Sequence, residues 1–203
     1  MRVPYGRDIF MPRPKSFDPD TVLAKAMGVF WEKGYDAASI SDLTQAMGIN
    51  RFSLYDTFGD KRELYLSTLD AYDRIVVLPF ISKLEAINTF QDLEACFSMI
   101  IDYHHSGESS LCCMMQKAAI TQATCDQGTK ERVECVRNRI HTAISQSLGR
   151  IQGIGEIKAD IDVSQAAWLL KIALAGLASQ ATCPLHADDM KAAFGLIFES
   201  FRP

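Results

Sequence analysis

Residues 41–61 read SDLTQAMGINRFSLYDTFGDK, and this stretch decides how the first part of the chain folds. Its apolar spacing predicts two short helices, 39–47 and 50–58, which meet at Gly48. Glycine suits the junction because a positive φ there costs little only for glycine. Two helices joined by so short a turn form a helix-turn-helix, whose second helix can enter the major groove of DNA. The same spacing also fits a helical corner with a structural role alone.

Helical patterns fill the rest of the chain, and strand signals are close to absent. Asp18 and Pro19 open the first helix as N-cap and first helical residue, and Gly34 ends it. Pro79 is expected to stop a long helix that begins at Lys61. The predicted helices cover 19–33, 39–47, 50–58, 61–78, 82–88, 90–105, 111–122, 127–150, 162–182 and 187–200. The predicted fold class is therefore all-α.

Composition and charge restrict the possible classes of protein. Nearly half of the residues are apolar and the net charge is −4, typical of a globular protein with a real core. The start, MRVPYGRDIF, lacks the apolar region of a secretory signal, and no apolar run is long enough for a membrane span. Six cysteines without a CxxC pair are expected to be reduced thiols, so a cytoplasmic location without membrane contact is predicted. Residues 1–65 hold nine Lys/Arg and nine Asp/Glu, so any DNA contact depends on where the few cations lie.

Polar and aromatic side chains on the second short helix are the candidates for DNA contact. Arg51 can fork onto guanine, Phe52 can press on a thymine methyl, and Ser53 can reach a base edge or a phosphate. Lys61 is a phosphate candidate because its charge adds to the free N–H groups at a helix start. The predicted DNA-binding residues are Ser39, Thr44, Asn50, Arg51, Phe52, Ser53, Tyr55, Thr57 and Lys61. The apolar residues expected to turn inward are Leu43, Met47, Ile49, Leu54, Tyr55 and Phe58.

The stretch GYDAASISDLTQAMGINRFSLYDTFGDKRELYLSTL, residues 34–69, resembles the N-terminal domain of the TetR family of transcriptional repressors. The resemblance implies a three-helix DNA-binding domain followed by a larger helical domain that binds an effector and dimerises. The predicted division is a flexible extension at 1–15, a helix-turn-helix domain at 16–62 and an effector-binding and dimerisation domain at 63–203. It further implies a two-fold homodimer that binds a pseudo-palindromic operator in double-stranded DNA and leaves it when a small molecule binds.

Three residues depart from the family pattern. Thr44 stands where the family usually has alanine at the crossing of the two helices, and its added bulk can shift their angle. Phe52 replaces a commonly small residue, so no base preference can be carried over. Asp56 would repel a phosphate and is therefore left out of the predicted contacts.

A cysteine segment in the second domain suggests a sensor. LCCMMQKAAITQA, residues 111–123, resembles a Gly-Cys-Leu-Leu segment of one TetR subgroup, with Cys113 on the family cysteine. The resemblance implies a thiol that senses electrophiles or oxidants, which requires an exposed thiolate. Free cysteines are also often plain core residues. A metal set of His104, His105, Cys112 and Cys113 lacks a recognised spacing, so no metal or cofactor is predicted.

The remaining predictions concern the effector and the dimer. Met and aromatic residues at helical spacing can line an apolar pocket, although they are more often core. The predicted pocket or sensor residues are Phe97, Met99, Tyr103, His104, Cys112, Cys113, Met114 and Trp168, with Met115 as a further apolar neighbour. The broad apolar faces of 163–182 and 187–201 fit the dimer interface that the family implies, or packing within one chain.

No nucleophile elbow, phosphate-binding glycine loop or HExxH motif occurs, so the chain is not expected to be an enzyme. We predict a DNA-binding regulator, most readily a repressor, that an effector releases from its operator. Two alternatives remain open at this point. One is a helical protein that binds a ligand or a partner but no DNA, and the other is a reactive-thiol enzyme that uses Cys112 and Cys113.

Overall fold

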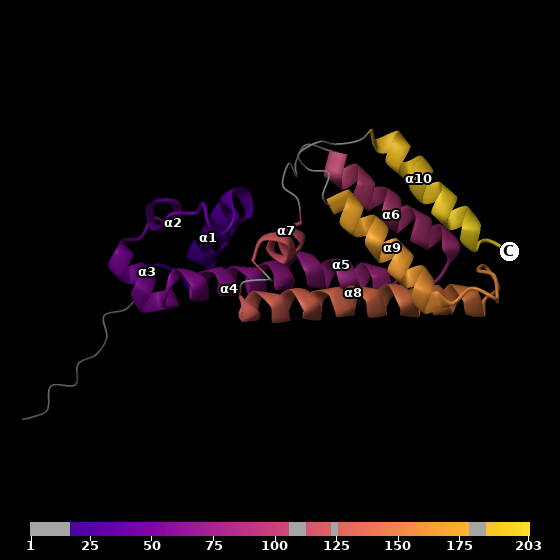
Figure 1. The fold of residues 1–203 in the computed structure, drawn as a ribbon, viewed down its shortest axis with the longest axis horizontal. Helices are drawn as coiled ribbons and strands as arrows, with labels where there is room; N and C mark the ends of the chain where they lie inside the picture. Colours follow the sequence, from indigo (N-terminus) through magenta and orange to yellow (C-terminus); the bar gives the residue numbers. More distant parts are fainter. Residues whose placement is uncertain (1–16, 106–112, 123–125, 179–185) are drawn as a thin grey trace, which may run out of the picture.

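The computed structural model describes residues 17–105, 113–122, 126–178 and 186–203. All regular structure in these residues is helical, which confirms the predicted all-α class. One long rod of consecutive helices runs through the molecule, with a second long helix beside it (Figure 1). The first three helices lie at one end of the rod, and the last helices cover its other end (Figure 1).

The first three helices, α1 (Pro19–Lys33), α2 (Ile40–Met47) and α3 (Arg51–Phe58), begin and end within one residue of the predicted bounds. Each has a side chain that caps its first turn and a glycine at its end. Gly48 has φ 69° and ψ 30°, the left-handed conformation that lets α3 start after only three intervening residues. The helix-turn-helix geometry follows from this turn.

The long rod consists of α4 (Lys61–Tyr72), a π-helical turn (Asp73–Val77) and α5 (Leu78–Glu85). The prediction that Pro79 ends this helix is wrong. The amide of Leu78 bonds to the carbonyl of Asp73, five residues back, and Pro79 follows in the first turn of α5. Proline has no N–H to donate, and it stands just after the π-helical turn, where the regular hydrogen-bond spacing of an α-helix is already interrupted. Consequently the separate helix predicted at 82–88 is the end of the same rod.

The second domain contains α6 (Phe90–His105), α7 (Met114–Thr121), α8 (Gln127–Gly153), α9 (Val163–Ala178) and α10 (Ala187–Phe201). Aromatic rings hold α10 against α6: the ring of Phe97 lies 5.3 Å from that of Phe194 and 5.5 Å from that of Phe198. The division of the chain at residue 62 stays a prediction, and α4 runs across it. The predicted extension at 1–15 lies outside the described residues.

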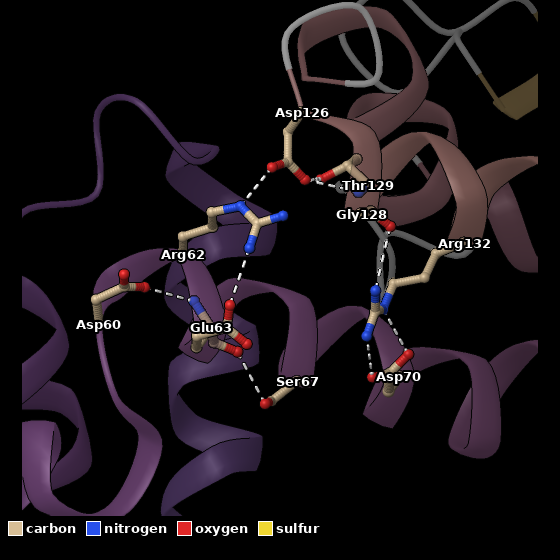
Figure 2. A network of polar contacts seen from close by, with 9 residues as sticks. All are labelled: Asp60, Arg62, Glu63, Ser67, Asp70, Asp126, Gly128, Thr129 and Arg132. Carbon is tan, nitrogen blue, oxygen red and sulfur yellow. Dashed lines mark hydrogen bonds and ion pairs between the residues drawn. The ribbon is translucent and has the colours of Figure 1, made fainter.

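Two ion pairs tie α4 to the start of α8 (Figure 2). The guanidinium of Arg62 donates to Asp126, which also accepts from the backbone amide of Thr129 at 2.7 Å and so caps α8. One turn further along α8, Arg132 donates to both carboxylate oxygens of Asp70, from Nε at 2.7 Å and from Nη2 at 2.8 Å. The two helices approach closely because Gly128 lies between these pairs, where a Cβ would be 2.9 Å from the Arg62 guanidinium. The start of α8 is therefore fixed against the helix that follows the helix-turn-helix.

We expect Asp126→Asn to lower the free energy of unfolding at neutral pH. Arg62 loses its charged partner, while asparagine still caps α8. Burial alone would raise the pKa of Asp126, but hydrogen bonds from Arg62 and Thr129 hold it below its usual value. A depressed folded-state pKa means that the carboxylate stabilises the fold fully above an unfolded pKa of about 3.9, and this contribution is lost as the pH falls through the folded-state pKa.

Urea unfolding of parent and variant between pH 7 and pH 3 measures this effect. The difference between the two should shrink below about pH 4. A difference that stays constant over the whole range would show that the ion pair does not stabilise the fold.

Candidate DNA-binding surface

The outward face of α3 presents Arg51, Phe52, Tyr55 and Asp56 to solvent, with Phe52 79% exposed. Leu54 is completely buried and holds the helix against its neighbours. The expectation that Tyr55 turns inward is wrong: it is 38% exposed, whereas Phe58 is half-buried as its spacing suggests.

Arg51 and Tyr55 form a pair one turn apart on α3. Nη2 of Arg51 donates to the Tyr55 hydroxyl at 3.3 Å, and the guanidinium carbon lies 5.5 Å from the ring centroid. Residues four apart on a helix meet in this way, and the aromatic face attracts the cation. The pair therefore orients the guanidinium on the outer face of α3.

Several polar candidates already have partners within their own helices. The Asn50 side chain accepts from the Ser53 amide at 2.8 Å, so Asn50 serves as the N-cap of α3. The Ser39 hydroxyl accepts from the Asp42 amide at 3.0 Å and donates to its carboxylate at 2.8 Å. The Thr44 hydroxyl donates to the Ile40 carbonyl at 2.9 Å. The hydrogen bonds of these three side chains stabilise α2 and α3. The two remaining candidates on α3, Ser53 and Thr57, are half-buried.

Asp42 also binds Lys33 at 2.8 Å, which joins the end of α1 to the start of α2. The hydrogen bond from Lys33, together with those from the backbone amide and hydroxyl of Ser39, holds the pKa of Asp42 well below its usual value. The carboxylate therefore stays charged, and Lys33 is less available to a phosphate.

Lys61 lies at the first position of α4, and its ammonium is 4.5 Å from the centroid of the Tyr35 ring. The Tyr35 ring in turn stacks on the Phe30 ring, with centroids 6.3 Å apart, and lies tilted against the Tyr65 ring, with centroids 5.0 Å apart. Burial raises the pKa of Tyr35, and nearby Asp60 raises it further, so the ring remains neutral. Tyr35 thus holds the cation beside the helix start. The sequence did not predict this role, because Lys61 lies 26 residues further along the chain.

Acidic groups outnumber basic groups on this domain, because residues 17–63 hold eight carboxylates and five cations. Lys33 and Arg62 are paired with carboxylates. Within the described part of the chain, Arg51 and Lys61 contact aromatic rings and have no ion pair. These two cations are the best placed to face phosphates or bases.

The predicted effector residues lie in separate places. Phe97 is buried against α10, and Met114 is buried at the start of α7. Met99 and Tyr103 are about half exposed on α6. Trp168 is 46% exposed on α9. Its ring centroid lies 4.4 Å from that of His141 and 3.9 Å from the Lys171 ammonium. Cys112 and the side chain of His104 lie outside the described residues.

Cys113 is half-buried directly before α7, and the Tyr72 hydroxyl lies 3.5 Å from its sulfur. Burial raises the pKa of Tyr72, and the neighbouring Cys113 raises it further. Of the other described cysteines, Cys96 is buried, which raises its pKa, and Cys135 is exposed on α8. Across the described ranges, no group of three or more His, Cys, Asp or Glu side chains could hold a metal ion.

An open groove of about 450 Å³ lies between α1 and the junction of α4 with the π-helical turn, and none of its lining residues is a predicted effector residue. Its lining residues are Asp20, Leu23, Ala24, Ala71, Arg74 and Ile75. Nothing in the sequence marked this groove, because its residues come from two segments fifty positions apart. None of the helices in the described part is both long and apolar enough to cross a membrane.

Comparisons with known proteins agree with this geometry. Residues 22–68 match the family model described as bacterial regulatory proteins, tetR family. The chain is 32% identical to the HTH-type transcriptional regulator YezE of Bacillus subtilis (strain 168), over 77% of this chain and 82% of YezE. It is 30% identical to the HTH-type transcriptional repressor ComR of Escherichia coli (strain K12), over 83% of this chain and 81% of ComR.

Among solved structures, a cysteine mutant of the TetR family transcriptional regulator CifR, complexed with 26bp double-strand operator DNA, is similar over almost the whole chain. The TM-score is 0.81 at 26% identity, and the match covers 93% of this chain and 99% of that one.

Proposed function

The chain belongs to the TetR family of bacterial regulatory proteins and is a DNA-binding transcriptional regulator, and from this premise we propose how its own residues bind an operator. Arg51 and Phe52 read base edges from the outer face of α3, and Lys61 binds a phosphate at the start of α4. The oriented Arg51–Tyr55 pair carries this proposal, because it presents a guanidinium without a carboxylate partner among the described residues.

The regulator acts as a homodimer, formed through α9 and α10. Large apolar side chains are exposed on both helices, with Ile172 66% and Leu196 76% exposed. Such side chains are typical of a surface that a second copy covers. Two copies related by a two-fold axis place two α3 helices on successive major grooves, so the operator is pseudo-palindromic. The protein represses until a small molecule bound in the second domain releases it, and it has no catalytic role.

Fluorescence anisotropy with duplex DNA from upstream of its own gene, and with duplexes selected by the protein from a random pool, tests this function. We expect tight, sequence-selective binding that weakens as salt increases, because phosphate contacts release counterions. Failure to select any duplex would favour the alternative of a helical protein that binds a ligand or a partner but no DNA. Turnover of a substrate without DNA would instead favour a reactive-thiol enzyme.

The position of Cys113 supports a second element of the proposal, release of DNA by electrophiles. The sulfur touches the hydroxyl of buried Tyr72, and the Tyr72 ring meets Trp31 of α1 edge to face at 5.1 Å. A group added to the sulfur lies directly beside the Tyr72 hydroxyl, and we propose that it displaces Tyr72. Alkylation takes place at the thiolate form of a cysteine.

We expect Cys113→Ser to abolish the release of DNA by N-ethylmaleimide while leaving operator affinity nearly unchanged. Serine keeps the shape of the side chain but cannot be alkylated under the same conditions. Cys135→Ser, which changes an exposed cysteine on α8, is the matched control and should respond like the parent. Fluorescence anisotropy before treatment measures the operator affinity of each variant, and anisotropy after treatment measures the release of DNA. Release that persists in Cys113→Ser would remove this residue as the sensor.

A further inference from the structure

A lysine of the second domain binds the end of the first helix. Nζ of Lys117, on α7, donates to the backbone carbonyls of Trp31 at 3.0 Å and Glu32 at 2.8 Å. Both carbonyls belong to the last turn of α1. In Figure 1, α7 lies between the first three helices and the rest of the second domain. A side chain far along the chain thus caps a helix of the DNA-binding domain.

The chemistry of this contact suits a cap. The last carbonyls of a helix have no partner within the helix, and a cation near them is stabilised by the helix dipole. Across the described residues, Lys117 forms no ion pair with a carboxylate. Gly34 follows directly at φ 81°, and a Cβ there would lie 3.4 Å from Cε of Lys117. The lysine stem therefore packs over the point where α1 ends.

A second contact is made from the residue that follows α7. Gln122 is only 7% exposed, and its Nε2 donates to the carboxylate of Asp36 at 2.7 Å. Asp36 lies in the turn between α1 and α2. Lys117 and Gln122 together hold both sides of Gly34. The turn then continues through the completely buried Ala38 to Ser39, the N-cap of α2.

We propose that Lys117 and Gln122 are positioning residues for DNA binding, which fix the end of α1 and the turn into α2 from the second domain. This inference rests on the proposed function. Neither side chain lies on α2 or α3, so neither is expected to contact DNA. Their effect is on where the two helices lie relative to the dimer, and hence on the distance between the two α3 helices.

The spacing between operator half-sites is a direct readout of that distance. A dimer with fixed DNA-binding domains rejects an operator in which one base pair has been inserted between the half-sites, because the second α3 no longer meets its groove. If the domains are held less firmly, the rejection weakens. A loss of fold stability alone would weaken binding to both operators alike and would leave their ratio unchanged.

The test uses Lys117→Met, which keeps the stem and removes the ammonium, and Lys117→Arg, which keeps donors. Dissociation constants are measured for the duplex that the parent selects and for the same duplex with one inserted base pair. For Lys117→Met we expect affinity for the selected duplex to fall about tenfold and the ratio between the two duplexes to fall several-fold. Lys117→Arg should recover most of the affinity for the selected duplex and most of the ratio between the two duplexes.

Lys130→Met is the matched control, since it removes an exposed lysine that pairs with Glu134 on the surface of α8. It should behave like the parent in both measurements. A parent-like ratio of the two dissociation constants in Lys117→Met would overturn the proposal, even if overall affinity fell. If the parent selects no duplex at all, the proposed function fails, which is a different result.

Gln122→Met provides a separate test should Lys117→Met fail to fold. Methionine fills the same buried volume, and exposed Asp36 regains water when it loses its donor. We expect a smaller fall in the ratio of the two dissociation constants, in the same direction. An unchanged ratio would remove Gln122 from the positioning role.

Discussion

Replacing Arg51 by alanine is expected to weaken operator binding by about 2–6 kcal/mol, since one base contact of about 1–3 kcal/mol is lost in each half-site. The guanidinium lies on the exposed face of α3, where Tyr55 orients it. A guanidinium reads guanine through two hydrogen bonds, so its loss should also reduce the penalty for substituting that base pair. Anisotropy titrations with the selected duplex and with single-substituted duplexes measure both quantities.

Two comparison variants separate base reading from general attraction. Lys61→Ala removes a cation from the start of α4 and should weaken binding to all sequences alike, while reducing the salt slope by about one per half-site. Arg74→Ala removes an exposed arginine outside the helix-turn-helix and should have little effect. If Arg51→Ala keeps the parent's affinity and base preference, α3 has been placed on the wrong surface.

Leu54→Ala is expected to destabilise the DNA-binding domain by about 2–5 kcal/mol, the range for truncating a fully buried leucine. Leu54 is 0% exposed and is the buried residue of α3, so its side chain holds the recognition helix in place. Its removal leaves a cavity that the short helix cannot fill. Urea unfolding followed by circular dichroism measures the loss.

Phe52→Ala is the matched control for this prediction, because Phe52 lies two residues away on the same helix and is 79% exposed. It should change the free energy of unfolding by less than about 0.5 kcal/mol and alter only DNA binding. Equal destabilisation by the two substitutions would contradict the burial pattern of α3.

The helix-turn-helix could be predicted closely from the sequence, because its signals are local. Asp18, Ser39 and Asn50 each cap the helix that they precede, and Gly48 stands at the turn. The match of this stretch to the family extended the prediction to the whole fold. Cap residues and glycines act within a few positions, so a sequence pattern is sufficient to place them.

The effector residues could not be placed in this way. Phe97 and Trp168 have the same apolar character in the sequence, yet one is buried against α10 and the other stacks on His141 at the surface of α9. Which of two apolar side chains lines a cavity depends on how distant helices pack. The same holds for Lys117, whose partners are backbone carbonyls more than eighty residues away. No pattern of residue types records such a contact.

The π-helical turn at Asp73–Val77 sets the rotation between the two parts of the molecule. The buried face of the rod passes from Tyr72 to Val77 in a step of five residues, and Ile75 and Val76 are pushed to the surface. An ordinary α-helix turns by about 100° for each residue. Deleting one residue here would therefore turn α5 by about that angle relative to α4, and its buried face would no longer meet α8, which packs on both helices. A single extra residue thus determines which face of α5 packs against α8.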